Sequence, residues 1–205
     1  MFVKGEVKGL KKGTLYLQKQ VDTLLVSVDS IQLDGTGIYE LSDYQESPEI
    51  YYLNLDKDQE KRILFFGDQG EITINTKLDK FVLSADISGL KNQELLDEYS
   101  DMMRQFRNKN LDLIKAEFEA KGDSLKLDSI VKLSNSLLKR RYYYTTNFAV
   151  KHANSEVAPY LALTELFDAN ISLLDTVNLS LTPEIQSSKY GKELAKFIDE
   201  IKADN

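Results

Sequence analysis

The chain has 205 residues, no cysteine, one histidine and a formal net charge of −7. Without thiols it cannot form disulfide bonds, use a thiolate nucleophile or bind a metal through cysteine, and a zinc or iron site would depend almost entirely on carboxylates. Residues 1–89 and 90–205 are each acidic overall, which disfavours phosphate binding, so we expect no metal, no cofactor and no nucleic-acid partner.

Residues 1–88 have the pattern of short strands separated by turns. Runs of β-branched and aromatic residues alternate with Gly- and Asp-containing segments, and no helical period interrupts them. The predicted strands are residues 2–7, 14–17, 24–28, 31–33, 38–41, 50–55, 62–66, 72–74 and 81–83. We expect residues 34–37, Asp-Gly-Thr-Gly, to form a hairpin loop between two of them. Closely spaced strands without helices predict an antiparallel β-sandwich over residues 1–88.

After Gly89 the apolar residues recur every three or four positions, which predicts helices. The first helical face is marked by Leu95, Tyr99, Met102, Met103, Phe106, Leu113, Ile114 and Phe118. Gly122 and Asp123 then supply a helix-ending glycine and a capping carboxylate. A second helix, carrying Ile130 and Phe148, is expected to run antiparallel to the first.

Three further segments complete the C-terminal half. A helix is expected to begin near Ser155. Residues 171–181 are apolar, and their pattern does not decide between helix and strand. Thr182-Pro183 marks the start of a last amphipathic helix. The sequence therefore predicts an α+β protein, with an N-terminal antiparallel β-sandwich followed by a C-terminal α-helical bundle over residues 89–205.

Two groups of polar residues are candidates for catalytic or metal sites. His152 and Ser155 lie three residues apart at a predicted helix boundary, where a capping role explains both better than a nucleophile and its base. Asp56, Asp58 and Glu60 form part of a calcium-loop pattern without its central glycine or full ligand set, so a solvated turn is favoured. We therefore expect no catalytic residue.

The run Arg140-Arg141-Tyr142-Tyr143-Tyr144 is the most distinctive candidate for a ligand or partner surface. Arginine and tyrosine together can bind sugars or stacked rings. Successive helical residues point about 100° apart, however, so the three tyrosines cannot form one flat platform. The competing interpretation is a helix whose apolar face widens where it packs on its neighbours. If the tyrosines line a cleft between sandwich and helices, the protein is a small-ligand receptor.

Aromatic pairs on two predicted strands were also considered. Tyr51-Tyr52 and Phe65-Phe66 each occupy successive strand positions, so one member of each pair is expected to face inward and the other outward. The outward members are weak candidates for a binding surface.

Several segments carry a family resemblance. In the first half they are residues 3–7, 13–17, 29–31, 34–40, 48–53 and 64–74. In the second half, residues 148–155 have the pattern F-x-x-x-H-P-N-S with Ala153 in place of proline. Residues 188–194 are a second matching segment. Together they resemble the N-terminal β-sandwich of unknown function, and the helical region after it, in thioredoxin-like thiol–disulfide oxidoreductase lipoproteins of Gram-negative bacteria.

This resemblance implies a context and no chemistry. In those proteins the redox step belongs to a following thioredoxin-like domain with a Cys-x-x-Cys pair, so no catalytic residue can be transferred to this chain. The resemblance implies a non-catalytic binding or scaffolding module, either the front part of such a protein or a stand-alone relative. The expected partner is a thioredoxin-like domain or a client protein.

The expected location follows from the same resemblance. It is periplasmic or outer-membrane-associated, through a signal segment and lipid anchor that this chain lacks. With no signal-like run after Met1, the residues alone are equally compatible with a cytoplasmic protein.

Overall fold

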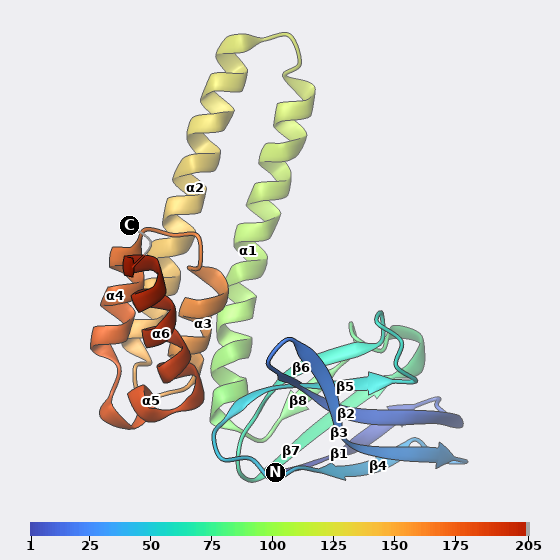
Figure 1. Cartoon of the computed structure of the whole chain (residues 1–205). Coiled ribbons are helices and arrows are strands. Elements are labelled where there is room, and N and C mark those ends of the chain that lie inside the picture. The colour runs from blue at the N-terminus through green and yellow to red at the C-terminus, as the bar shows by residue number, and fades with distance from the viewer. Residues whose placement is uncertain (204–205) are drawn as a thin grey trace. The chain divides into compact units, whose positions relative to one another are not determined.

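A computed structural model describes residues 1–203, and it has the predicted α+β layout of strands followed by helices (Figure 1). The chain divides into two compact units, Met1–Leu95 and a second that begins at Leu96. The first unit contains β1 (Phe2–Lys8), β2 (Lys12–Val21), β3 (Leu24–Asp34), β4 (Ile38–Ser42), β5 (Glu49–Leu55), β6 (Arg62–Gly67), β7 (Glu71–Lys77), the 3-10 helix η1 (Leu78–Lys80) and β8 (Asp86–Ser88).

The strands form two four-stranded sheets, ordered β4-β1-β7-β8 and β3-β2-β5-β6. All neighbouring strands are antiparallel except β1 and β7, which run parallel with Val3 opposite Ile72. The expectation of a wholly antiparallel sandwich is thus wrong at this pair. Parallel strands cannot be joined by a tight hairpin, and here the long connection between β1 and β7 includes the whole second sheet.

The hairpin predicted around residues 34–37 is also wrong. β3 pairs with β2, whereas β4 pairs with β1 in the other sheet, so these residues carry the chain from one sheet to the other. Gly37 accepts a hydrogen bond from the N–H of Val7 at 2.8 Å. A Cβ atom at position 37 would collide with the carbonyl oxygen of Val7, so this close passage requires glycine.

The strand predicted at residues 81–83 is a turn, and the last strand of the sheet is β8. Phe81 is buried, but Val82 and Leu83 are exposed, so the apolar run has only one core contact. The Thr76 hydroxyl donates to the carbonyl of Phe81 at 2.6 Å, and the N–H of Ser84 donates to the carbonyl of Lys80. These local bonds satisfy the backbone without a sheet partner.

One apolar core holds the two sheets together. Its buried members come from both sheets: Val3, Val7, Leu10, Leu15, Leu17, Leu33, Tyr39, Leu41, Tyr51, Leu53, Leu55, Ile63, Phe65, Ile72, Ile74 and Phe81. The rings of Tyr51 and Phe65 stack at its centre, 5.9 Å apart. Phe66 was expected to face outward if Phe65 faces in, but both are fully buried. β6 is an edge strand, and the buried Gln93 bonds to its open edge, where its side-chain oxygen accepts the N–H of Phe66 at 2.7 Å.

The helices are α1 (Lys91–Glu119), α2 (Ser124–Lys151), α3 (Val157–Glu165), α4 (Ile171–Ser180), α5 (Pro183–Ser187) and α6 (Lys189–Ala203). The predicted break between α1 and α2 is confirmed: Gly122 has a φ of +92°, and the Asp123 carboxylate accepts the N–H of Lys126 at 3.1 Å. The open segment at 171–181 is a helix, whose first turn is capped by Asn170. Within residues 1–203, no helix is long and apolar enough to cross a membrane.

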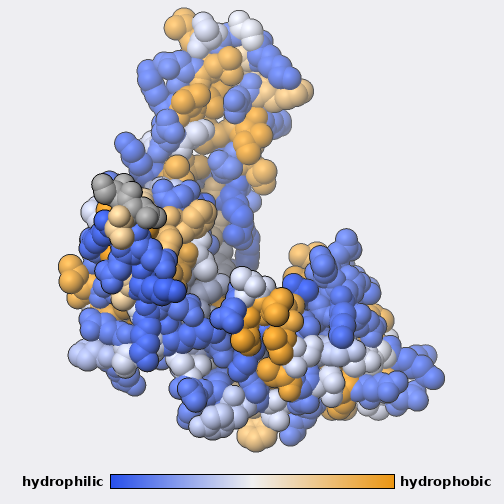
Figure 2. All heavy atoms as spheres, in the orientation of Figure 1, coloured by the Kyte–Doolittle hydropathy of each residue, from blue (hydrophilic) through white to orange (hydrophobic). Residues whose placement is uncertain are grey.

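The second core belongs to the helical unit. Ala149 of α2, the buried faces of α3 and α4, and Leu194 and Ile198 of α6 form it. The short helices cover only one end of the α1–α2 hairpin (Figure 1). Toward the other end, Ile114 and Phe118 of the predicted α1 face are more than half exposed, and apolar side chains gather on this part of the hairpin (Figure 2).

The two faces of β6 give a test of the sandwich core. Replacing Phe65 by alanine leaves a cavity beside Tyr51, and we expect the free energy of unfolding of the first unit to fall by about 3–5 kcal/mol. Leu64→Ala, on the partly exposed face of the same strand, is the matched control and should cost about 1 kcal/mol or less. Hydrogen exchange of peptides from β5 and β6 measures this unit separately, and equal effects of both variants would contradict the assignment of the core.

Candidate functional site

The five residues nominated from the sequence lie on α2 in different environments. Arg140 is exposed, and Tyr143 is 60% exposed. Tyr142 is half-buried, and its hydroxyl donates to Asp168 Oδ1 at 2.8 Å. Tyr144 packs among aromatic rings, 6.0 Å from Phe106 between ring centroids. The three tyrosines therefore share no surface, as the helical spacing predicts, and Arg141 alone of the five lines the cavity described next.

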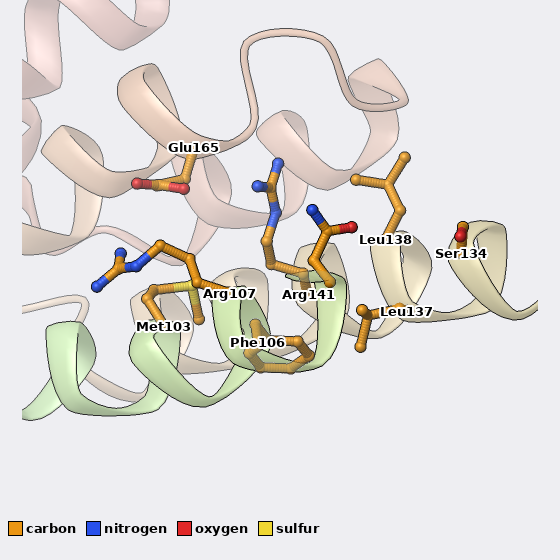
Figure 3. Close-up of a pocket in the computed structure, with 9 residues that line it drawn as sticks. Met103, Phe106, Arg107, Ser134, Leu137, Leu138, Arg141 and Glu165 are labelled. Carbon is orange, nitrogen blue, oxygen red and sulfur yellow. The ribbon is translucent and has the colours of Figure 1, made fainter. Parts of the chain in front are cut away.

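The cavity lies in the helical unit, and its volume is about 490 Å³. Residues of α1, α2 and the end of α3 line it, and one side is open to solvent (Figure 3). Its lining combines apolar, polar and charged side chains: Met103, Phe106, Arg107, Asn110, Ser134, Leu137, Leu138, Arg141 and Glu165. Pockets of this size that pair an apolar lining with a few converging polar groups are the usual form of small-molecule sites.

Ring and hydroxyl contacts join α1 to α2 next to two lining residues, Phe106 and Arg141. Tyr144 lies between Phe106 and Phe148, and the ring of Tyr99 lies 5.4 Å from that of Phe148. The Tyr99 hydroxyl and the Thr145 hydroxyl are hydrogen-bonded at 2.7 Å, and Thr145 also donates to the backbone carbonyl of Arg141. This network fixes the turn of α2 from which Arg141 enters the pocket.

Three charged groups meet at the pocket. Glu165 is the last residue of α3, and the guanidinium groups of Arg107 and Arg141 flank its carboxylate (Figure 3). Burial raises the pKa of Glu165, although the two nearby arginines act in the opposite direction. The C-terminal end of a helix carries partial negative charge, so it too is an unfavourable place for a carboxylate. The Nε atom of Arg141 is buried and has no hydrogen-bond partner among the described residues.

A second charged cluster lies in the sandwich unit. The Lys19 ammonium donates to Asp43 Oδ2 at 2.8 Å and lies 3.3 Å from Glu49 Oε1. The Tyr51 hydroxyl donates to the same Asp43 oxygen at 2.7 Å. Although burial alone would raise it, the pKa of Asp43 is lowered, because hydrogen bonds from Lys19 and Tyr51 stabilise the carboxylate.

The sandwich cluster does not have the properties of a catalytic group. Burial, and the neighbouring Asp43 and Glu49, raise the pKa of Tyr51 far above its ordinary value of 10, so its hydroxyl keeps its proton at neutral pH. Although burial opposes it, contacts with the same carboxylates raise the pKa of Lys19, which therefore stays an ammonium. Because each charge faces an internal partner, the cluster serves to tie β2 to β5 and to the segment after β4.

The residues weighed as catalytic or metal sites have local structural contacts. His152 ends α2, where its backbone N–H donates to the carbonyls of Phe148 and Ala149. Ser155 Oγ accepts the N–H of Val157 at the start of α3. Asp56 accepts the N–H of Thr14, across from its turn, at 2.7 Å. Residues 1–203 contain no group of three or more His, Asp or Glu side chains placed to hold a metal ion.

One strand edge of the sandwich carries uncovered apolar residues. β3 is the edge strand of its sheet, and Leu24 to Ser27 in its first half are all exposed. Leu24 is 68% exposed, and the five residues 24–28 include no charged side chain. Ser42, the last residue of β4, donates its N–H to Asp29, so residues 24–28 lie beyond the end of β4.

Sequence reasoning found Arg141 but missed Arg107, Glu165 and Lys19. Arg107 falls on α1 within a series of charged and amide residues, and nothing local distinguishes it. Glu165 carries one signal, since an acidic residue is unusual in the last turn of a helix. Lys19 carries none, because its partners Asp43 and Glu49 are more than twenty residues away.

Comparison with known proteins gives one result. Residues 1–96 match a family described as a domain of unknown function (DUF4369). The match spans the sandwich unit, Met1–Leu95. No curated protein and no solved structure gives a significant match to the chain.

The Lys19–Asp43 contact predicts a pH dependence of stability. Because the folded-state pKa of Asp43 lies below its ordinary value of 3.8, the stabilisation is present above that value and is lost as pH falls through the folded-state pKa. Asp43→Asn should lower the free energy of unfolding at pH 7 by about 1–3 kcal/mol and should flatten its decline between about pH 5 and pH 2. Hydrogen exchange of β2 and β5 measures both effects.

The control for this experiment is Asp34→Asn, whose carboxylate is exposed and lies 3.7 Å from the Lys12 ammonium. It should leave the slope with pH close to that of the unaltered chain, since exposed ion pairs contribute little. Equal slopes for all three proteins would show that Asp43 is not stabilised in the fold.

Proposed function

We propose that this chain is a non-catalytic extracytoplasmic binding module, and that the first half of β3 receives an extended segment of a partner protein. The observation that carries the proposal is the uncharged, mostly apolar and exposed edge at Leu24 to Ser27. Natural edge strands are usually protected by lysine, proline, a bulge or a covering segment. β3 has such a bulge at Val28, but Leu24 to Ser27 before it include neither lysine nor proline. That stretch is suited to strand addition, in which backbone hydrogen bonds give affinity and alternate side chains give specificity.

The pairing register supports this use of the edge. β2 and β3 are joined by the two-residue turn Asp22-Thr23, with Val21 opposite Leu24 and Gln20 opposite Leu25. In such a hairpin the pair next to the turn exchanges hydrogen bonds, and the following pairs alternate. In this register the backbone groups of Leu25 and Ser27 point toward the outer edge, where an added strand can bind them.

The cellular context in this proposal rests on sequence similarity. The segments that resemble the front of thioredoxin-like disulfide oxidoreductase lipoproteins span both units of the chain, and the first unit matches a domain of unknown function. We accordingly place the module in the periplasm or at the outer membrane, where its partner is a thioredoxin-like domain or a client protein. In that setting the module positions its partner and leaves the redox step to it.

A small-ligand receptor is the second candidate function. The sequence suggested a receptor whose cleft is lined by tyrosines 142–144. These tyrosines occupy three different environments, so they do not line one cleft together. The pocket within the helical unit gives this candidate a different basis, because it offers a defined volume and converging charged groups.

Strand addition can be tested with one pair of variants. Leu25→Pro removes the outward N–H, whereas the matched Leu25→Ala removes the same side chain and keeps the N–H. The probe is an array of twelve-residue synthetic peptides with alternating β-branched residues, together with copies that contain a central proline. We expect the unaltered chain and Leu25→Ala to bind the uninterrupted peptides, and Leu25→Pro to lose on the order of tenfold in affinity.

Hydrogen exchange of β2 and β5 in both variants checks that the sandwich is intact. Equal peptide binding by Leu25→Pro and Leu25→Ala, or equal binding of peptides with and without proline, would overturn the proposal. So would the failure of the unaltered chain to bind any peptide of the array.

A further inference from the structure

We propose that the helical pocket binds a small apolar molecule that ends in a single carboxylate. This proposal rests on the second candidate function, the small-ligand receptor, and names its ligand class; strand addition at β3 is tested separately. The lining supplies both parts of such a ligand's recognition: two guanidinium groups for the carboxylate, and apolar side chains of α1 and α2 for the rest.

The charge of the pocket favours an anion. Arg107 and Arg141 contribute two positive charges against the one negative charge of Glu165. A guanidinium group presents several N–H donors in a plane and binds carboxylates through paired hydrogen bonds. The Nε atom of Arg141 has almost no accessible surface, so the terminal N–H groups of the two guanidinium groups are the donors that a ligand carboxylate can reach.

Glu165 acts as an internal competitor for the same guanidinium groups. Its carboxylate lies between them in Figure 3, at the negative end of α3 and in a partly buried position. Both factors disfavour its charged form, so Glu165 offsets the charge of the two arginines less than a fully solvated carboxylate would. The pocket therefore keeps an attraction for a ligand carboxylate, and neutralising Glu165 should strengthen anion binding.

The apolar part of the ligand can pack against an apolar surface of α1 and α2. Met103, Phe106, Leu137 and Leu138 form the apolar lining of the pocket. This apolar lining continues along the α1–α2 hairpin. Ile114 is one turn beyond Asn110 on the same face of α1, and Val131 is two turns before Leu138 on the same face of α2. Both are more than half exposed. From Arg107 to Ile114 the helix rises about 10 Å, which is enough to accommodate a medium-length alkyl chain.

The experiment is calorimetric titration of the full chain with sodium decanoate. Acetate has the charge without the tail, and decanol has the tail without the charge, so both should bind on the order of tenfold more weakly or not at all. Arg141→Met and Arg107→Met should each weaken decanoate binding on the order of tenfold, and Glu165→Gln should strengthen it severalfold. Opposite effects of the arginine and glutamate variants would not arise from general loss of structure.

Arg140→Met is the matched control, because Arg140 precedes Arg141 on α2 but is exposed and does not line the pocket. It should bind decanoate as the unaltered chain does. N-acetyl-leucyl-leucine, with a free carboxylate, distinguishes a peptide end from a fatty acid as the source of the ligand. The proposal is overturned if neither carboxylate binds, if decanol binds as well as decanoate, or if Arg140→Met and Arg141→Met have equal effects.

Discussion

The apolar contact between the two four-stranded sheets is the interaction on which the first unit depends. Each sheet buries one face against the other, and sixteen side chains from Val3 to Phe81 share this core. The chain must therefore pass repeatedly from one sheet to the other. The close passage at Gly37 follows from this requirement, and so does the charged tie between Lys19 and Asp43. The exposed half of β3 is also a result, because a two-sheet sandwich has free edges that a closed barrel lacks.

The sequence predicted the class of each half correctly because the hydrophobic period changes from strand-like to helical near Gly89. It also predicted the α1–α2 turn, since a glycine at positive φ followed by a capping aspartate is a local signal. The errors concern contacts between distant residues. The Asp-Gly-Thr-Gly segment is typical of a hairpin loop, but the partners of β3 and β4 are chosen by the sheets they join. Likewise the outer N–H of Phe66 is bonded by Gln93, 27 residues later, and local alternation could not show that Phe66 is buried.

The candidate pocket shows the same limit. Arg141 was nominated because it stands in an unusual run of basic and aromatic residues. The local pattern cannot tell it from Arg140, which differs from it by one position on α2 and by its exposure. Helix packing makes that distinction, because the Thr145 and Tyr99 hydroxyl groups fix the turn that directs Arg141 inward. The approach of Arg107 and Glu165 depends on how three helices meet, and no spacing along the chain encodes it.

The parallel pairing of β1 with β7 has a consequence for how the first unit forms. β1 lies in the middle of its sheet, and one of its two neighbours is a strand about seventy residues later in the chain. That sheet cannot close until Lys77 is available, so the earlier strands remain without a complete core while the chain emerges from the ribosome. Folds dominated by such distant contacts form slowly and expose apolar surface while they do so. For a protein whose β3 edge is exposed and largely apolar at Leu24 to Ser27, that interval is when chaperone binding matters most.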